Sequence, residues 1–202
     1  MAELSIDFET ASAADLKTPG SRAYAAHPTT RVLCMAWAFD NGPVQVWRAG
    51  DPFPQAVLDH VRAGGIVRGW DVAFEFDVWN LCLVRQVMFL PPLELAQVRD
   101  TMAQAAYFGL PLSLDAAGQA LQLALQKDKA GHALMLRMCR PRSTRPDGSY
   151  AWWHETDEQK YQELMAYCRT DVLVERSIAA CLPSLPSAEL TIWQLDRRMN
   201  LH

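Results

Sequence analysis

The sequence predicts a mixed α/β fold, in which a central sheet is flanked by helices. Three strand-like runs open the chain, "LSIDFE", "RVLCMAWAF" and "GPVQVWRA". Asn41 and Gly42 separate the second run from the third, and an Asn-Gly pair between two apolar runs is typical of an antiparallel hairpin. Later segments have the length and apolar spacing of helices. We therefore expect antiparallel strands at the start of the chain, with helices packed on their sheet.

The composition bounds the class of protein. The chain has 202 residues, of which 50% are hydrophobic, enough for one well-buried domain with an appended element. No apolar run reaches the length of about 18 residues that a transmembrane helix needs, and the start lacks the pattern of a signal peptide. We therefore expect a cytoplasmic protein. The five cysteines show no C-x-x-C spacing, which favours free thiols over a zinc site.

The charge is acidic overall and basic locally. The formal net charge is −4, whereas surfaces that bind nucleic acid are usually basic. One segment departs from this balance, with six basic residues against two acidic ones: Lys127, Lys129, Arg137, Arg140, Arg142 and Arg145 against Asp128 and Asp147. The net charge therefore leaves nucleic-acid binding open.

Short strands and helices alternate in the middle of the chain. The apolar residues Val57, Leu58 and Val61 predict a helix over residues 54–62, and "GGIVRGWD" predicts a short strand that enters a turn. Residues 74–89 have helical length and apolar content, and Pro91 and Pro92 follow them. We expect a helix that ends before these prolines.

Two shorter helices are expected before the basic segment. The first covers residues 101–108 and ends at the break "GLP". Ser113 is then placed to cap a second helix that extends to about residue 123. Residues 127–155 are mixed in character, and "RPDGS" within them predicts a turn.

A long helix is expected to begin at "HETDEQ". Thr156 and Gln159 match a capping box, and Asp157 and Glu158 suit the first turn of a helix. Nothing breaks the pattern before Cys181.

The last residues predict a change of organisation. "LPSLPSAEL", residues 182–190, contains two prolines and reads as a linker. "TIWQLDRRMNLH" then reads as an amphipathic helix cut off in mid-pattern, which suggests that the natural chain continues. We therefore expect one domain over residues 1–181, followed over residues 182–202 by a linker and the start of another region.

The stretch "ELSIDFET", residues 3–10, carries two acids on a predicted strand. Because side chains alternate between the faces of a strand, Asp7 and Glu9 point to the same side. Their Cα atoms should lie about 6 to 7 Å apart, and like charges that close repel unless a cation, a proton or water relieves them. An isolated pair of this kind more often lies on an edge strand with one solvated face, so the rest of the chain must decide.

Further oxygen-bearing side chains follow later in the chain. Tyr167 and Asp171 are spaced i, i+4 on the long helix, which stacks them on one face. With the pair on the first strand and a further acid after a strand and turn in the middle, they form an ordered set. Such a set can hold two divalent cations about 4 Å apart, which activate a water and stabilise the leaving oxygen of a phosphodiester.

In these motifs the sequence resembles the tyrosine-containing branch of the DEDD superfamily of 3′-to-5′ exonucleases, and in particular the N-terminal proofreading domain of phage-type family A DNA polymerases. "SIDFET" is similar to the first motif and "YCRTD" to the third. Similarity extends through "GSRAYAAHP", "AWAFDNGPVQVW", "RDTMAQAAYFGLPLSLDAAGQAL" and "MCRPR" to about residue 181, and "LPSLPSAELTIWQLDRRMN" resembles the junction with a polymerase region. The resemblance implies a ribonuclease H-like fold, with a mixed central sheet whose first three strands are antiparallel.

The second motif departs from the family pattern H-N-x-x-F-D or H-N-x-x-F-E, because this chain has "WDVAFEFD". One register makes Glu75 the metal-linked acid and puts Trp70 and Asp71 in place of the family's His and Asn. The other register uses Asp77 and puts Ala73 at the Asn position. We favour Glu75, whose longer side chain still reaches a cation. A negative Asp71 near a substrate phosphate is expected to slow catalysis or to alter its preference.

The resemblance also implies roles for individual residues. Two Mg²⁺ or Mn²⁺ ions would be held by four carboxylates: Asp7, Glu9, Glu75 and Asp171. Asp7 would bridge the ions, and Tyr167 would orient the attacking water or help to deprotonate it. Because an ordinary phenol has a pKa of about 10, the ions must supply most of the acidification. The residues implied as substrate contacts are Phe8, Thr10, Asp71 and His132.

The implied activity is release of nucleoside 5′-monophosphates from the 3′ end of single-stranded DNA, in a natural chain that carries a polymerase region. Two alternatives remain open. The first is a catalytically weakened module, which binds single-stranded DNA or stabilises a polymerase. The second is an exonuclease that processes RNA ends. The sequence contains no G-x-S-x-G, Walker or G-x-G-x-x-G string, which argues against a serine hydrolase, a P-loop enzyme and a dinucleotide-binding protein.

Overall fold

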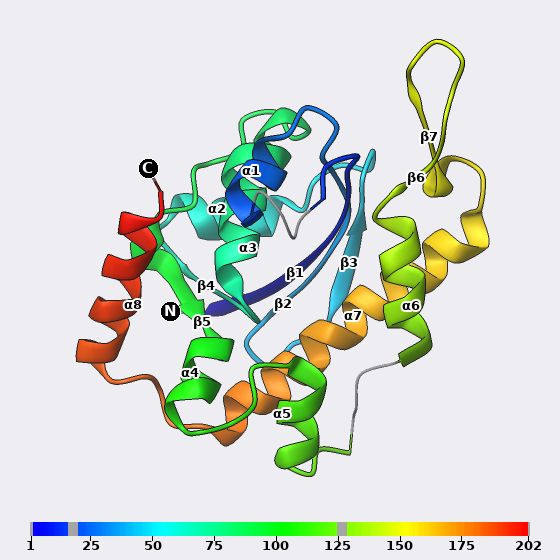
Figure 1. Cartoon of the computed structure of the whole chain (residues 1–202). Coiled ribbons are helices and arrows are strands. Elements are labelled where there is room, and N and C mark those ends of the chain that lie inside the picture. Colours follow the sequence, from blue (N-terminus) through cyan, green and yellow to red (C-terminus); the bar gives the residue numbers. More distant parts are fainter. Residues whose placement is uncertain (1, 16–19, 125–128, 202) are drawn as a thin grey trace.

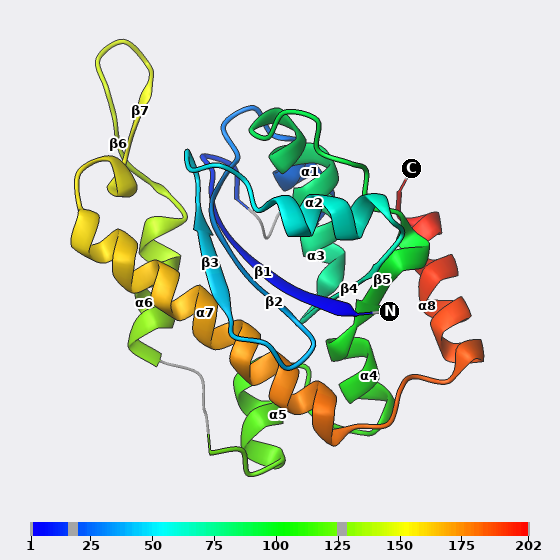
Figure 2. The ribbon, with the colours of Figure 1, turned by 180° about the vertical axis from the view of Figure 1, so that it is seen from behind.

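A computed structural model of the chain describes residues 2–15, 20–124 and 129–201. A five-stranded sheet lies at the centre with helices around it, and a small two-stranded sheet projects from the body (Figures 1 and 2). The strands of the central sheet are β1 (Glu3–Ala11), β2 (Arg31–Phe39), β3 (Gln45–Arg48), β4 (Ile66–Gly69) and β5 (Val98–Asp100). The mixed α/β fold predicted from the sequence is confirmed.

The central sheet has the strand order β3-β2-β1-β4-β5. β1 pairs antiparallel with β2 and β2 pairs antiparallel with β3, whereas β4 runs parallel to β1 and β5 parallel to β4. The predicted antiparallel arrangement of the first three strands is confirmed. The loop from β2 to β3 is longer than a two-residue Asn-Gly hairpin, because β3 begins only at Gln45. The residue with a positive φ in this loop is Asp40, at 42°.

The two faces of β1 have different surroundings. Leu4, Ile6 and Phe8 lie in the main hydrophobic core on one face. Asp7 and Glu9 lie on the other face, where α7 packs. The alternation read from the sequence is thus confirmed, and the acids face a helix rather than open solvent.

α7 (Glu158–Cys181) packs across β1 and β2. The side chains that β2 presents to it are small, which lets the helix approach closely. These residues are Cys34, Ala36 and Ala38, and they share a buried cluster with Cys168 and Val172 of α7. The close approach brings one side of α7 up to the acids of β1.

The start of α7 differs from the prediction. Asp157 is the N-cap, and its carboxylate accepts a hydrogen bond of 3.1 Å from the backbone N–H of Lys160. The predicted capping box of Thr156 and Gln159 is therefore wrong. Asp caps a helix as well as Thr does, so the sequence offered two adjacent caps and the fold uses the second. The predicted end at Cys181 is confirmed.

The segment expected to form one helix over residues 74–89 has three different turns. α3 (Val72–Asp77) continues into a π-helical turn over Val78–Cys82 and a 3₁₀ turn over Leu83–Arg85. The Asn80 side chain donates to the backbone oxygens of Phe76 and Leu93, which ties the π turn to the following loop. Apolar content predicted the helical character, but it does not report such a change of pitch.

The remaining elements of the body surround the sheet: α1 (Gly20–Ala26), α2 (Gln55–Arg62), α4 (Thr101–Tyr107) and α5 (Leu114–Ala120). Asp100 caps α4, since its side chain accepts from the backbone N–H groups of Met102 and Ala103. α5 begins after Ser113 as predicted, but the Ser113 side chain makes no capping hydrogen bond and the helix ends at Ala120.

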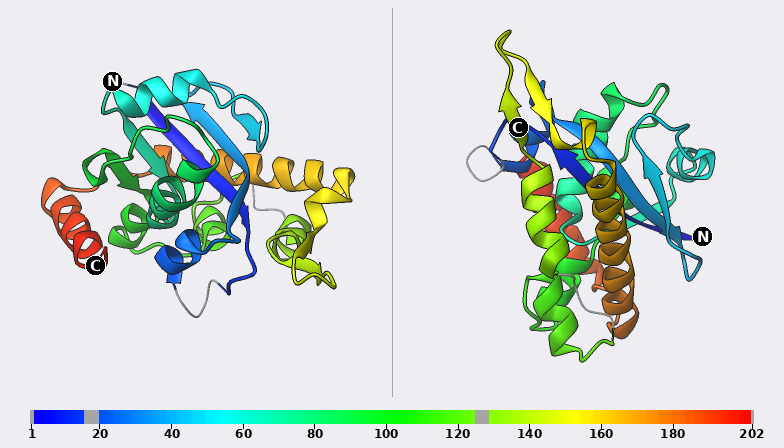
Figure 3. Two further views of the ribbon diagram at one scale, coloured as in Figure 1. Left: turned by 90° about the horizontal axis from the view of Figure 1, so that it is seen from above. Right: turned by 90° about the vertical axis from the view of Figure 1, so that its right-hand side faces the viewer.

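α6 (Lys129–Met138) lies beside α7, as the right-hand view in Figure 3 shows. The sequence did not predict this helix. A hairpin of β6 (Pro141–Thr144) and β7 (Tyr150–Trp152) follows and projects from the body (Figure 1). The predicted "RPDGS" turn closes this hairpin, where the backbone N–H of Arg145 donates to the oxygen of Ser149 at 2.7 Å.

α8 (Ser187–Met199) begins inside the stretch that was expected to be a linker. It packs on the body at the edge formed by β5 (Figure 1). The Trp193 indole N–H donates to the Asp100 carboxylate at 3.1 Å, and Trp193 and Leu201 contact the main core. Side-chain contacts therefore join α8 to the sheet.

Two general expectations concern membranes and thiols. Within the described part of the chain, no helix combines the length and the apolarity that crossing a bilayer requires. The five cysteines are free, with Cys34, Cys82 and Cys168 buried, Cys139 half-buried and Cys181 exposed. The prediction of free thiols is confirmed.

Candidate active site

Asp7 and Glu9 lie on the part of β1 that no longer pairs with β4. β4 pairs only with residues Glu3 to Ser5 of β1, so both acids lie beyond the carboxyl end of β4. In α/β sheets the carboxyl ends of parallel strands commonly border a binding crevice. Ligand atoms of Asp7, Glu9 and Cys168 all lie within 4.8 Å of one another.

α7 supplies Tyr167 and Asp171 to the same region. Their exposed fractions are 3% and 7%. Burial raises the pKa of Tyr167 above its ordinary value of 10.0, and the nearby carboxylates of Asp171, Glu9 and Asp7 raise it further. Because an ordinary phenol is already protonated at neutral pH, this rise strengthens that preference, and the Tyr167 hydroxyl can donate a hydrogen bond.

Glu75 reaches the region from a third element. β4 ends at Gly69, where an added Cβ would lie 3.1 Å from the backbone oxygen of Ile6. Asp71 then takes the left-handed conformation, with φ of 52°, which Asp tolerates better than most residues. This tight connection sets Glu75 on the first turn of α3, close to Asp7.

Glu75 carries a buried carboxyl group whose hydrogen bonding is incomplete among the described residues. It is 3% exposed, and its Oε2 has no hydrogen-bond partner among the described residues. Burial raises its pKa well above 4.5, and the charges of Asp7 and Asp71 add to the rise. A buried acid of this kind is unfavourable unless a proton or a cation compensates it.

Asp77, the alternative metal-linked acid, points elsewhere. Its Oδ2 accepts a hydrogen bond of 2.7 Å from Ser21, and guanidinium nitrogens of Arg22 and Arg197 lie 3.8 Å from its carboxylate. It is 1% exposed and does not line the pocket that contains Glu75. Asp77 therefore ties α3 to α1 and α8.

One pocket of about 410 Å³ gathers these groups. The predicted catalytic and metal-binding residues that line it are Asp7, Glu9, Glu75, Tyr167 and Asp171. They come from β1, α3 and α7, which are far apart in the sequence. The fold thus brings all five predicted residues together.

The four predicted substrate contacts divide into two groups. Phe8, Thr10 and Asp71 line the pocket. The Phe8 ring also packs on Trp79, with ring centroids 6.5 Å apart. His132 is exposed on α6 and is absent from the lining of the pocket, so the structure does not bring it to the other residues.

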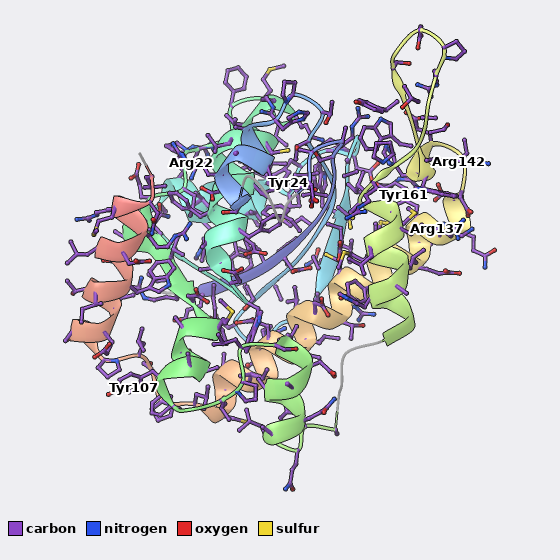
Figure 4. All side chains as sticks on the ribbon, viewed as in Figure 1. Arg22, Tyr24, Tyr107, Arg137, Arg142 and Tyr161 are labelled. Carbon is purple, nitrogen blue, oxygen red and sulfur yellow. The ribbon has the colours of Figure 1, made fainter. Side chains whose placement is uncertain are left out.

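Several lining residues were missed by sequence reasoning. Tyr24 donates or accepts a 2.9 Å hydrogen bond with Thr10, and Met135, Leu136 and Arg140 reach the pocket from α6 and the residues after it. Figure 4 shows Tyr24 on the α1 side of the site. The run "MCRPR" and the local excess of arginine were the available signals for Arg140. No pattern identified α6 as a wall of the site.

The pocket fits hard divalent cations. The carboxylates of Asp7, Glu9, Glu75 and Asp171 line it, and their oxygens are the ligands that Mg²⁺ and Mn²⁺ prefer. The buried Oε2 of Glu75, which has no hydrogen-bond partner in the part of the chain that the structure describes, is an available donor beside Asp7. These observations agree with a site for divalent cations.

Sequence comparison relates the chain to a DNA polymerase. No family model matches it. It is 34% identical over 210 residues to the DNA polymerase of Bacillus phage SP02, across 99% of this chain. The chain spans 31% of the length of that polymerase. The similarity is therefore to a part of a larger protein.

Structural comparison gives a related result. The family B DNA polymerase from the hyperthermophilic archaeon Pyrobaculum calidifontis superimposes with a TM-score of 0.51 and 14% identity. The match covers 89% of this chain and 24% of the polymerase. At this identity the likeness concerns the fold alone.

Proposed function

We propose that the protein is a 3′-to-5′ exonuclease of the tyrosine-containing DEDD type, with a ribonuclease H-like fold. The observation that carries the proposal is the convergence of Asp7, Glu9, Glu75, Tyr167 and Asp171 on one pocket. Similarity to a phage DNA polymerase supports a role on DNA. The activity would serve proofreading during DNA replication.

Four carboxylates would hold two divalent ions, Mg²⁺ or Mn²⁺: Asp7, Glu9, Glu75 and Asp171. Bound ions of this kind lower the pKa of water and stabilise the charge that develops on a leaving oxygen. The buried Oε2 of Glu75 supports this assignment, because it would otherwise remain without a partner among the described residues.

Tyr167 would orient the attacking water. Its raised pKa favours the protonated phenol, so we assign it the role of hydrogen-bond donor to the water and not that of the base. The proton must therefore leave through solvent or a neighbouring carboxylate. Loss of this orientation would lower the rate without removing the cation ligands.

The pocket also suits a terminal nucleotide. Aromatic rings of Tyr24, Trp70 and Phe74 line it beside the carboxylates, and base stacking on such rings tolerates any sequence. Asp71 lines the same pocket, so its negative charge would weaken binding of a phosphate that approaches α3. The substrate is a single-stranded 3′ end, and the product is a nucleoside 5′-monophosphate.

The longer relative supports a second part of the proposal. The chain matches 31% of the phage polymerase, which leaves most of that protein outside the match. We assign residues 1–181 to the exonuclease domain and residues 182–202 to a junction with a polymerase region. α8 would then be the element through which that region meets the exonuclease.

A labelled-oligonucleotide assay tests the function. Single-stranded DNA labelled at its 3′ terminal nucleotide should release a labelled 5′-monophosphate in Mg²⁺ or Mn²⁺ but not in EDTA, and Asp7→Asn should abolish the release. A matched control is Asp115→Asn, which removes an acid on α5 outside the pocket. Absence of release in both metals would favour a binding module, and faster release from RNA would favour an RNA-processing enzyme.

A further inference from the structure

A groove of about 360 Å³ lies next to the catalytic pocket, between residues 12–15 and the β6–β7 hairpin. Ala14, Asp15 and Arg140 line both cavities, so the groove continues the pocket toward the hairpin. Its remaining lining residues are Ser12, Ala13, Pro141, Ser143, Thr144 and Tyr150. A nucleic-acid strand whose end lies in the pocket can therefore extend along the groove.

The outer wall of the groove is rich in hydroxyl groups. Ser143 and Thr144 are exposed on β6, and Tyr150 lies opposite Thr144 on β7. Hydroxyl groups and arginines are the side chains that most often contact the phosphates and sugars of nucleic acids. Arg140 and Asp15 lie at the end shared with the pocket. Beyond that end, the lining carries no carboxylate within the described residues.

The charge around the hairpin is positive. Residues 137–155 contain four arginines, Arg137, Arg140, Arg142 and Arg145, against the two acids Asp147 and Glu155. Glu155 and Arg145 form an ion pair at 2.9 Å and neutralise each other, so the segment keeps a net charge of +2. An acidic protein thus has a locally basic surface beside its candidate active site, where a polyanionic strand would gain attraction.

Side-chain contacts hold the hairpin in place. A register shift between Pro141 and Ser143 frees Arg142, whose guanidinium lies 5.2 Å from the ring centre of Trp153 and donates to the Thr156 hydroxyl. Arg137 covers the same ring at 4.1 Å. Figure 4 shows Arg137 and Arg142 together on this side of the molecule. These contacts tie β6 and α6 to the 3₁₀ turn Trp153–Glu155, which follows β7, so the hairpin is held at its base.

We propose that this groove is a second substrate subsite, which binds the sugar-phosphate backbone of the nucleotides upstream of those held in the pocket. The inference rests on the proposed exonuclease function, because the pocket defines where the strand ends. The ligand is single-stranded nucleic acid, bound through its backbone and without selection among bases. Short strands are held by the pocket alone, and longer strands also occupy the groove.

Binding of two strand lengths to a charge-insertion variant tests the subsite. Fluorescently labelled trithymidylate and dodecathymidylate would be titrated against the full chain in EDTA, where no hydrolysis occurs, at several salt concentrations. Thr144→Glu adds a negative charge to the exposed wall of the groove and alters no residue that lines the pocket. We expect the Kd for the dodecamer to rise about tenfold, and its salt dependence to fall by about 0.7 in the log–log slope per lost phosphate contact.

Thr191→Glu on α8 is the matched control, because it adds the same charge at an exposed position that does not line the groove. Ser143→Glu repeats the test at the neighbouring position, and thermal unfolding shows that each variant is folded. The proposal is supported if the Kd for the dodecamer rises while the Kd for the trimer stays within about twofold of the wild-type value. It is overturned if the Kd values for both oligonucleotides rise by the same factor, or if the Kd for the dodecamer does not change. Because no turnover is measured, this result is independent of whether the chain releases mononucleotides.

Discussion

Ser21 donates a hydrogen bond of 2.7 Å to the Asp77 carboxylate, which directs Asp77 toward α1 although it lies only two residues after Glu75. Two residues along a helix turn a side chain by about 200°. Glu75 therefore faces the pocket while Asp77 faces the contact with α1 and α8. The two acids of the second motif should respond differently to mutation.

Glu75→Gln should lower the rate of mononucleotide release by at least about a hundredfold, because a metal ligand contributes several kcal/mol to the transition state. The same change removes a buried charge, so the thermal stability measured without metal should stay equal or rise. Asp77→Asn should instead reduce stability and retain much of the rate. Loss of release in Asp77→Asn together with full activity in Glu75→Gln would reverse the assignment.

Tyr167→Phe tests the role of the phenol. We expect release to slow by about ten- to a hundredfold, with a pH profile parallel to that of the wild type. The reason is that the pKa of Tyr167 is raised above 10.0, so the phenol stays protonated between about pH 6 and pH 9. Rates would be measured across this range at saturating Mg²⁺. An alkaline rise present in the wild type and lost in Tyr167→Phe would show that the phenolate is a base.

Asp100 should make stability depend on pH. Burial raises its pKa from 3.8 to about 6, so the folded state favours the protonated carboxyl. Stability from this group is complete below about pH 4 and is lost as the pH rises through about 6. Urea unfolding between about pH 5 and pH 7 should therefore show a loss of about 1 kcal/mol in the wild type that Asp100→Asn lacks. Asn retains the helix cap, and equal pH dependence in both proteins would contradict the prediction.

Arg197 should stabilise the contact of α8 with the body. Its guanidinium lies 3.8 Å from the buried Asp77 carboxylate, whereas Arg198 is exposed. Arg197→Met should lower the free energy of unfolding by about 1 to 3 kcal/mol, since it leaves a buried charge with fewer partners. Arg198→Met should change it by less than about 0.5 kcal/mol. Equal effects of the two substitutions in urea titrations would show that the Asp77 contact contributes nothing.

Much of the fold could be predicted because its signals are local. The alternation in "ELSIDFET" set the two faces of β1, and the apolar runs gave β2 and the first pairings. The element boundaries that differed are decided by tertiary contacts. The π-helical turn contains Asn80, which donates to the backbone oxygen of Leu93, and Asp157 caps α7 one residue after the predicted cap Thr156.

The site residues likewise divide into those with a local sequence signal and those that only tertiary contacts bring to the site. Spacing on β1 and α7 singled out Asp7, Glu9, Tyr167 and Asp171, because each pair lies within a single element, and the family resemblance implied their roles. The choice between Glu75 and Asp77 needed the position of Ser21, which lies 56 residues away from Asp77. The wall formed by α6 depends on packing against α7 and leaves no periodic signal of its own.

Mn²⁺ bound in a crystal of the protein would test the central claim most directly, because anomalous scattering locates the metal independently of activity. We expect two peaks about 4 Å apart in the pocket, within ligand distance of Asp7, Glu9, Glu75 and Asp171. Crystals saturated with Mn²⁺ that show no peak among these carboxylates would contradict the account.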